Sequence, residues 1–263
     1  MKKLFILFFC GFLTMTGCQK DDPKYGGKIG NLSWMLYNDG TFIVNGTGEI
    51  PDYWIFPTEN LPPWYEYREE ILKVSIGNNI SKVGSFAFFR SENLTSVTFG
   101  KSVSAIGFRA FSGCSSLKSV VIPDLVTVIE DDSFSGCSDL ASVTIPNSVT
   151  VIEYASFYQC ESLASIVIPN SVTTIGESAF LGCNNLISAT IGSSVTTIED
   201  DAFRNCGSLK EIINHQEVPQ IIGRWVLGGV SKVNCRLFVP AKSVDAYRLS
   251  DVWKEFVHIQ AIN

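Results

Sequence analysis

The sequence predicts a solenoid, a coil of stacked turns, built from one 23-residue unit that occurs six times over residues 73–210. Two observations predict it. The sixteenth position of the unit is phenylalanine and the twenty-second is leucine in all six copies, and the copies follow one another without a gap. The units begin at Lys73, Ser96, Ser119, Ser142, Ser165 and Ser188.

Burial explains why the apolar positions recur. One unit has too few apolar residues to enclose a core, whereas stacked units place equivalent side chains over one another. Fully burying one phenylalanine contributes roughly 1.5–3 kcal/mol. The two invariant columns are Phe88, Phe111, Phe134, Phe157, Phe180 and Phe203, and Leu94, Leu117, Leu140, Leu163, Leu186 and Leu209.

Within a unit we expect short strands joined by short helical turns. Residues 142–145 alternate polar and apolar, which is typical of a half-buried strand, and Pro146 cannot donate a ladder hydrogen bond and should end it. Val149 and Ile152 indicate a second extended piece, and residues 155–158 a helical or 3₁₀ turn. Acidic residues precede these turns. We interpret them as N-caps rather than a calcium site, because the most acidic units are three apart.

The spacing of Leu163, Ile166 and Ile168 matches the Leu-x-x-Leu-x-Leu core of a leucine-rich repeat. The whole unit, Ser-Ile-Val-Ile-Pro-Asn-Ser-Val-Thr-Thr-Ile-Gly-Glu-Ser-Ala-Phe-Leu-Gly-Cys-Asn-Asn-Leu over residues 165–186, resembles the BspA-type leucine-rich repeat of bacterial surface proteins. The resemblance covers all six units. It implies a leucine-rich repeat solenoid, closed by an N-terminal hairpin cap and a C-terminal α/β cap, that serves as a scaffold for adhesion and other binding.

Residues 1–18 are predicted to be a lipoprotein signal segment. Lys2 and Lys3 precede an apolar stretch over residues 4–13 that is too short to span a bilayer. Small residues before Cys18 resemble the bacterial lipobox, which implies cleavage before Cys18 and its lipidation. The alternative is an ordinary secretory signal with a chance cysteine.

Residues 19–30 are expected to be a polar tether. Their lysine and acids resemble the signal that sends some lipoproteins to the outer face of the outer membrane, so the implied location is the surface of a bacterium.

The two flanks are expected to close the ends of the solenoid. Residues 31–72 should contain a hairpin with its turn at Asp39-Gly40, and residues 211–263 a last strand and a helix. Trp54 and Trp64 allow two interpretations: a platform on which sugars stack, or a cover over the first repeat.

The composition excludes several classes of function. The formal net charge is −6, and −8 without residues 1–18, so the chain lacks the basic surface of a nucleic-acid-binding protein. We find no Cys-x-x-Cys, phosphate loop or dinucleotide motif, and neither His215 nor His258 has a nucleophile beside it. We therefore expect no enzyme, metal or cofactor. The five cysteines of the repeat are expected to be buried free thiols rather than disulfides.

The strand face that points away from the core is the candidate binding surface. Its side chains are small, hydroxylated and uncharged, which suits a protein or glycan chain better than a small metabolite. The alternative is a plain solvated face. Three functions stay open: an adhesin or recognition module, a glycan-capture protein using Trp54 and Trp64, and a structural envelope protein. The candidate residues are Ser96, Thr98, Ser119, Ser142, Thr144, Ser165, Ser188 and Thr190.

Overall fold

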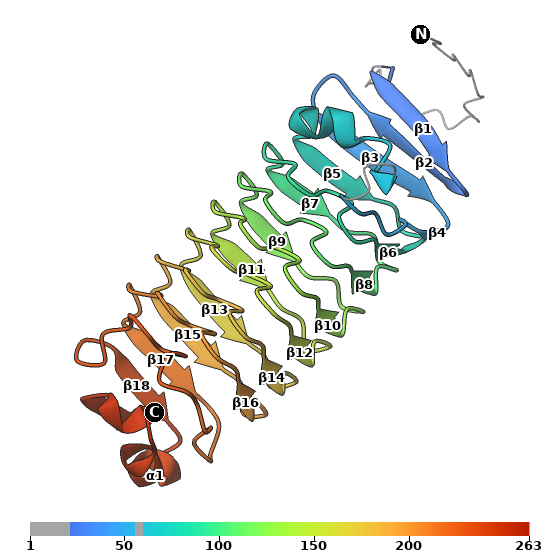
Figure 1. The fold of residues 1–263 in the computed structure, drawn as a ribbon. Helices are drawn as coiled ribbons and strands as arrows, with labels where there is room; N and C mark the ends of the chain where they lie inside the picture. The colour runs from blue at the N-terminus through green and yellow to red at the C-terminus, as the bar shows by residue number, and fades with distance from the viewer. Residues whose placement is uncertain (1–21, 56–59, 263) are drawn as a thin grey trace, which may run out of the picture.

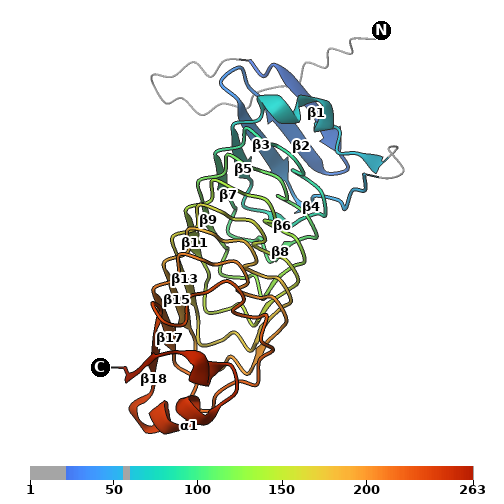
Figure 2. The same ribbon diagram turned by 60° about the vertical axis from the view of Figure 1, so that its left-hand side comes forward.

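The computed structural model describes residues 22–55 and 60–262 and coils them into a rod of stacked turns (Figure 1). β1 (Tyr25–Ile29) and α1 (Val244–Leu249) lie at opposite ends of the rod. Each regular turn has three sides: a strand of a main sheet, a shorter strand of a second sheet, and a tight turn. The repeated coil is seen more directly in Figure 2.

The main sheet runs the length of the rod in two hydrogen-bonded groups. Its strands are parallel except in the antiparallel pairs β1–β2 and β2–β3. The first group contains β1 (Tyr25–Ile29), β2 (Leu32–Leu36), β3 (Thr41–Gly46), β5 (Lys73–Ile76), β7 (Ser96–Thr98), β9 (Ser119–Val121) and β11 (Ser142–Thr144). The second contains β13 (Ser165–Ile168), β15 (Ser188–Ile191), β17 (Glu211–Asn214), β18 (Arg236–Val239) and β19 (His258–Ala261).

The second sheet is made of shorter parallel strands, also in two groups. One contains β4 (Gly48–Glu49), β6 (Ile80–Val83) and β8 (Ala105–Ile106), and the other β10 (Val128–Ile129), β12 (Val151–Ile152), β14 (Thr174–Ile175) and β16 (Thr197–Ile198).

Helices occur only near the ends of the part of the chain that the structure describes. They are η2 (Tyr65–Glu70), η3 (Ala241–Ser243), α1 (Val244–Leu249) and η4 (Trp253–Glu255). Within the described chain, no helix combines the length and apolar character needed to cross a membrane.

The third side of each turn differs from the helical turn that the sequence predicted. The fourteenth and eighteenth residues of every unit have positive φ. These left-handed residues interrupt the backbone conformation that a helix would need. This arrangement directs the N–H groups of positions 14, 16 and 18 toward the next turn. Thus Asp132, Phe134 and Gly136 donate to the carbonyls of Tyr154, Ser156 and Tyr158 at 2.9, 2.9 and 2.7 Å. We call this hydrogen-bonded row the turn ladder.

Five of the six residues with positive φ at position 14 are larger than alanine, and none is glycine. A left-handed conformation costs an L-residue roughly 1–2 kcal/mol. The hydrogen bonds of the turn ladder hold it in place. The residues are Phe86, Arg109, Asp132, Ala155, Ser178 and Asp201, with φ between 50 and 59°.

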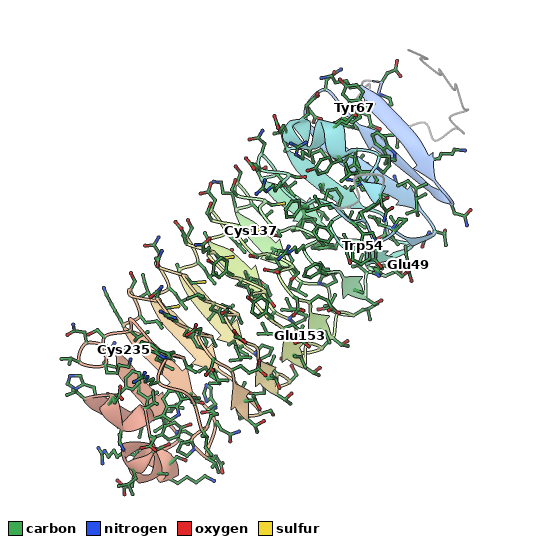
Figure 3. The ribbon with its side chains drawn as sticks, in the orientation of Figure 1. Glu49, Trp54, Tyr67, Cys137, Glu153 and Cys235 are labelled. Atoms are coloured by element: carbon green, nitrogen blue, oxygen red, sulfur yellow. The ribbon has the colours of Figure 1, made fainter. Side chains whose placement is uncertain are left out.

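The core consists of the columns that the sequence predicted. The phenylalanine rings are buried and stacked, with neighbouring centroids 5.2–5.6 Å apart and nearly parallel planes. The cysteine column is buried beside them, and Figure 3 shows Cys137 within it. Each of these five thiols donates to the carbonyl of the phenylalanine one turn earlier, as Cys137 does to Phe111 at 3.3 Å.

The stacking continues beyond the six regular units on both sides. β3 pairs in parallel with β5, and β17, β18 and β19 extend the same sheet past residue 210. Val226 and Gly228 accept turn-ladder hydrogen bonds from Phe203 and Asn205, so Leu227 stands where the earlier turns have phenylalanine. The regular sequence therefore ends at residue 210, but the solenoid does not.

Candidate binding surface

The eight predicted residues lie on one surface, the outer face of the main sheet. The register aligns them in two columns: Ser96 pairs with Ser119, Ser119 with Ser142, and Ser165 with Ser188. Six are exposed, and Ser188 and Thr190 are half-buried. We call this surface the strand face.

The hydroxyl groups of the strand face are not used by the fold. Within residues 22–55 and 60–262, none of the eight side chains has a hydrogen-bond partner. A second row of hydroxyls, on the residues directly before the strands of the second sheet, behaves differently. The side chains of Ser104, Thr150, Thr173 and Thr196 each donate to the carbonyl of the equivalent residue one turn earlier, at 3.1–3.4 Å. The two rows share a chemistry, but the fold uses four hydroxyls of the second row and none of the eight on the strand face.

Apolar groups interrupt the hydroxyl columns. Val121 and Val167 are 66% and 62% exposed and alternate with Thr98, Thr144 and Thr190 along one column. The face therefore offers methyl groups as well as hydroxyls.

Charge appears only where the strand face ends. The column that contains Ser96–Ser188 is preceded by Thr41 and Lys73 and continues into Glu211, Arg236 and His258. Ile213 and Phe238 continue the column of Thr190. Sequence reasoning missed these C-terminal members, because the 23-residue period ends before them.

Trp54 and Trp64 do not form a shared platform. Trp64 is 1% exposed, and its ring lies among Trp34, Phe42 and Phe88 at centroid distances of 5.0–5.9 Å. No face of that ring is open to a sugar. Trp54 is 51% exposed and lies at the edge of the first turns, near Glu49 (Figure 3).

The acidic residues contact the neighbouring turn rather than cap their own. The Asp131 carboxylate accepts the N–H of Tyr154 at 3.0 Å, and the Glu199 carboxylate accepts that of Glu177 at 3.0 Å. Partial burial, followed by repulsion from Asp131, raises the pKa of Glu153. No group of metal-ligating side chains suited to an ion occurs within the described residues.

The cysteines are free, as the sequence predicted. Burial raises the pKa of Cys137 and of Cys206 to about 12, so these thiols are held in their neutral form. A further buried thiol, Cys235, lies outside the regular units. Cys18, the predicted site of lipid attachment, lies outside the described residues.

The geometry defines a class: a parallel-stranded solenoid of leucine-rich repeats with an open strand face. The model of the BspA type leucine rich repeat region matches residues 64–186 and 104–226, with six copies. The chain belongs to this family.

Solved structures of similar fold come from several bacteria. A T. pallidum leucine rich repeat protein is 26% identical, with a TM-score of 0.54; the match covers 87% of this chain and 92% of that one. A leucine-rich repeat protein from Eubacterium ventriosum is 22% identical, with a TM-score of 0.44; the match covers 88% of this chain and 82% of that one. A leucine rich cell surface protein from Faecalibacterium prausnitzii is 19% identical, with a TM-score of 0.32; the match covers 92% of this chain and 96% of that one. No curated protein matches the chain.

Proposed function

We propose that the protein is a non-catalytic lipoprotein of the bacterial cell surface that binds a protein or a glycan through its strand face. The observation that carries the binding role is the set of eight hydroxyls without partners, set against the matching row that the fold uses. The lipobox-like end of the signal segment at Cys18 supports the anchor, and membership of the BspA family supports a binding scaffold.

The shape of the strand face favours a macromolecule. Five turns at strand spacing give a surface about 20 Å long. It is broad and carries no charge between Lys73 and Glu211 in its first column. A small metabolite is bound in an enclosed pocket, whereas an extended chain can contact several turns at once.

The test is a screen of residues 19–263 against immobilised extracellular proteins and oligosaccharides. A double variant, Ser142→Arg with Thr144→Arg, places bulk and charge at the centre of the face. A true ligand should lose at least tenfold in affinity. The control is Tyr154→Arg, at a 47% exposed site on the turn side. A ligand that is insensitive to the double variant does not use the strand face.

The surface location needs a separate test in cells. Protease shaving of intact cells should remove the protein while a periplasmic marker survives, and Cys18→Ala should abolish membrane association. If the protein were protected from protease, it would lie in the periplasm, and the proposal of a cell-surface protein would be overturned.

A second candidate function is glycan capture by Trp54. It rests on one ring rather than two. Trp54 is half exposed, and the centre of its ring lies 6.4 Å from that of Phe86. The Phe86 ring packs in turn against Phe108, with ring centres 5.3 Å apart. Trp54→Ala should abolish oligosaccharide binding without changing thermal stability if this surface is used.

A further inference from the structure

An apolar depression lies on the outer face of the main sheet, beyond the last hydroxyls of the strand face. Its volume is about 140 Å³, and Glu211, Ile213, Phe238 and Ile262 line it. Ile213 and Phe238 are partners across β17 and β18, and both point outward. They follow Thr190 in the same column, so the depression is continuous with the hydroxyl surface.

The size of the depression suits one side chain. An enclosed cavity of about 150 Å³ lined by leucine, isoleucine and phenylalanine holds benzene, and this depression, which is open to solvent, has a similar volume. A leucine-sized group or an aromatic ring therefore fits the depression on the strand face.

The charges at its rim neutralise each other. Arg236 donates to the Glu211 carboxylate at 3.3 Å, and its guanidinium lies 5.5 Å from the centre of the Phe238 ring. This arrangement leaves the rim without a net charge, which matches an uncharged occupant. A sugar is disfavoured, because three of the four lining side chains offer no partner for its hydroxyls and buried hydroxyls without partners are costly.

We propose that the depression anchors an aliphatic or aromatic side chain of a protein ligand, whose extended backbone runs onto Ser188 and Thr190. The proposal rests on the proposed function and assigns its partner to proteins rather than glycans. Burial of such an anchor is the kind of contact that dominates the affinity of a protein interface.

The direct test uses methyl-labelled protein and three probes. Two are capped peptides, Thr-Val-Leu-Val-Thr and Thr-Val-Ser-Val-Thr, and the third is maltohexaose. At millimolar concentration the leucine peptide should shift the methyl signals of Ile213 and Ile262. The serine peptide should bind at least about tenfold more weakly, as expected for loss of one buried apolar side chain. Equal shifts from both peptides, shifts at these methyls from maltohexaose, or no shift from the leucine peptide would overturn the proposal.

A matched pair of variants completes the test. Ile262→Glu places a carboxylate in the wall of the depression and should abolish the leucine-peptide shifts at Ile213. Ile221→Glu makes the same change at a side chain that is 99% exposed and does not line the depression, and should leave them unchanged. Matching thermal melts show that both variants fold.

The same variants separate this inference from the proposed function. One outcome is that a protein from the screen fails to bind the Ser142→Arg, Thr144→Arg double variant and still binds Ile262→Glu. In that case the anchor proposal is wrong and the proposal of binding through the strand face holds. If both variants retain the protein, both proposals fail.

Discussion

The indole N–H of Trp64 donates a hydrogen bond of 2.7 Å to the backbone carbonyl of Ala87. In later turns the equivalent carbonyl receives the backbone N–H of a column phenylalanine, as Ser156 does from Phe134. Trp64 therefore takes the place of a missing turn at the first rung of the turn ladder. This role requires a buried donor and explains why its ring is unavailable to a ligand.

Trp64→Phe should destabilise the protein by about 1–3 kcal/mol, because it leaves the Ala87 carbonyl buried and without a donor. Trp54→Phe is the matched change at an exposed ring and should cost less than about 0.5 kcal/mol. Urea denaturation of the two variants measures the difference. Equal stabilities would show that the hydrogen bond does not contribute to closing the ladder.

Phe134→Ala should cost about 3–5 kcal/mol, as for a buried aromatic truncation. Its ring is fully buried and lies between Phe111 and Phe157, 5.6 Å from each. Val121→Ala on the strand face is the control, and its cost should stay below about 1 kcal/mol. A loss for Phe134→Ala in that exposed-site range is incompatible with the stacked column.

Gly136→Ala should destabilise by about 1 kcal/mol through backbone conformation alone. Gly136 has φ +72°, and an added Cβ would meet its nearest neighbours at 3.7 Å, so there is room for it. Gly207 also has room, with its nearest neighbour at 3.9 Å, but its φ is not positive. Gly207→Ala should therefore be neutral or stabilising, and thermal melts distinguish the two. The same loss at both positions would show that the positive φ of Gly136 is not the cause.

The buried thiols should make the protein less stable in alkali. Burial raises the pKa of Cys137 from 9.0 to about 12, so between these pH values the thiol is neutral in the folded protein and ionised in the unfolded chain. The unfolded chain loses this proton near pH 9, and stability should fall between about pH 9 and 12 as the unfolded thiolate forms. Urea midpoints measured across this range should fall less steeply for Cys137→Ala. The folded protein should also react with a thiol reagent at pH 8 only after denaturant is added.

The sequence predicted the regular part of the fold because the buried apolar residues recur once in every turn of the solenoid. Phe134 and Leu140 recur every 23 residues, and their columns are the core. A last strand and a helix were expected after residue 210, but the continued stacking of turns was not predicted, because Glu211 pairs with Arg236 across a spacing of 25 residues and Leu227 replaces the marker phenylalanine.

Other features depended on contacts that periodicity does not encode. Trp54 and Trp64 belong to one aromatic stretch, and only packing against Phe42 and Phe88 decides that Trp64 is buried. The left-handed residues of the turns escaped detection because position 14 never holds glycine. The strand face itself was predictable from strand alternation, whereas the depression beside Phe238 required the pairing of β17 with β18.

The turn ladder has a single polarity, and this makes the units interchangeable. Each of the first five units donates the same three N–H groups forward, and each of the last five accepts them on the same three carbonyls, whatever its side chains. If residues 142–164 were removed and Ala141 joined to Ser165, Phe134 would meet the Ala179 carbonyl in place of that of Ser156. The rod can thus be shortened or lengthened by whole units, with its ends and the chemistry of its faces preserved, so its length is set by the number of units.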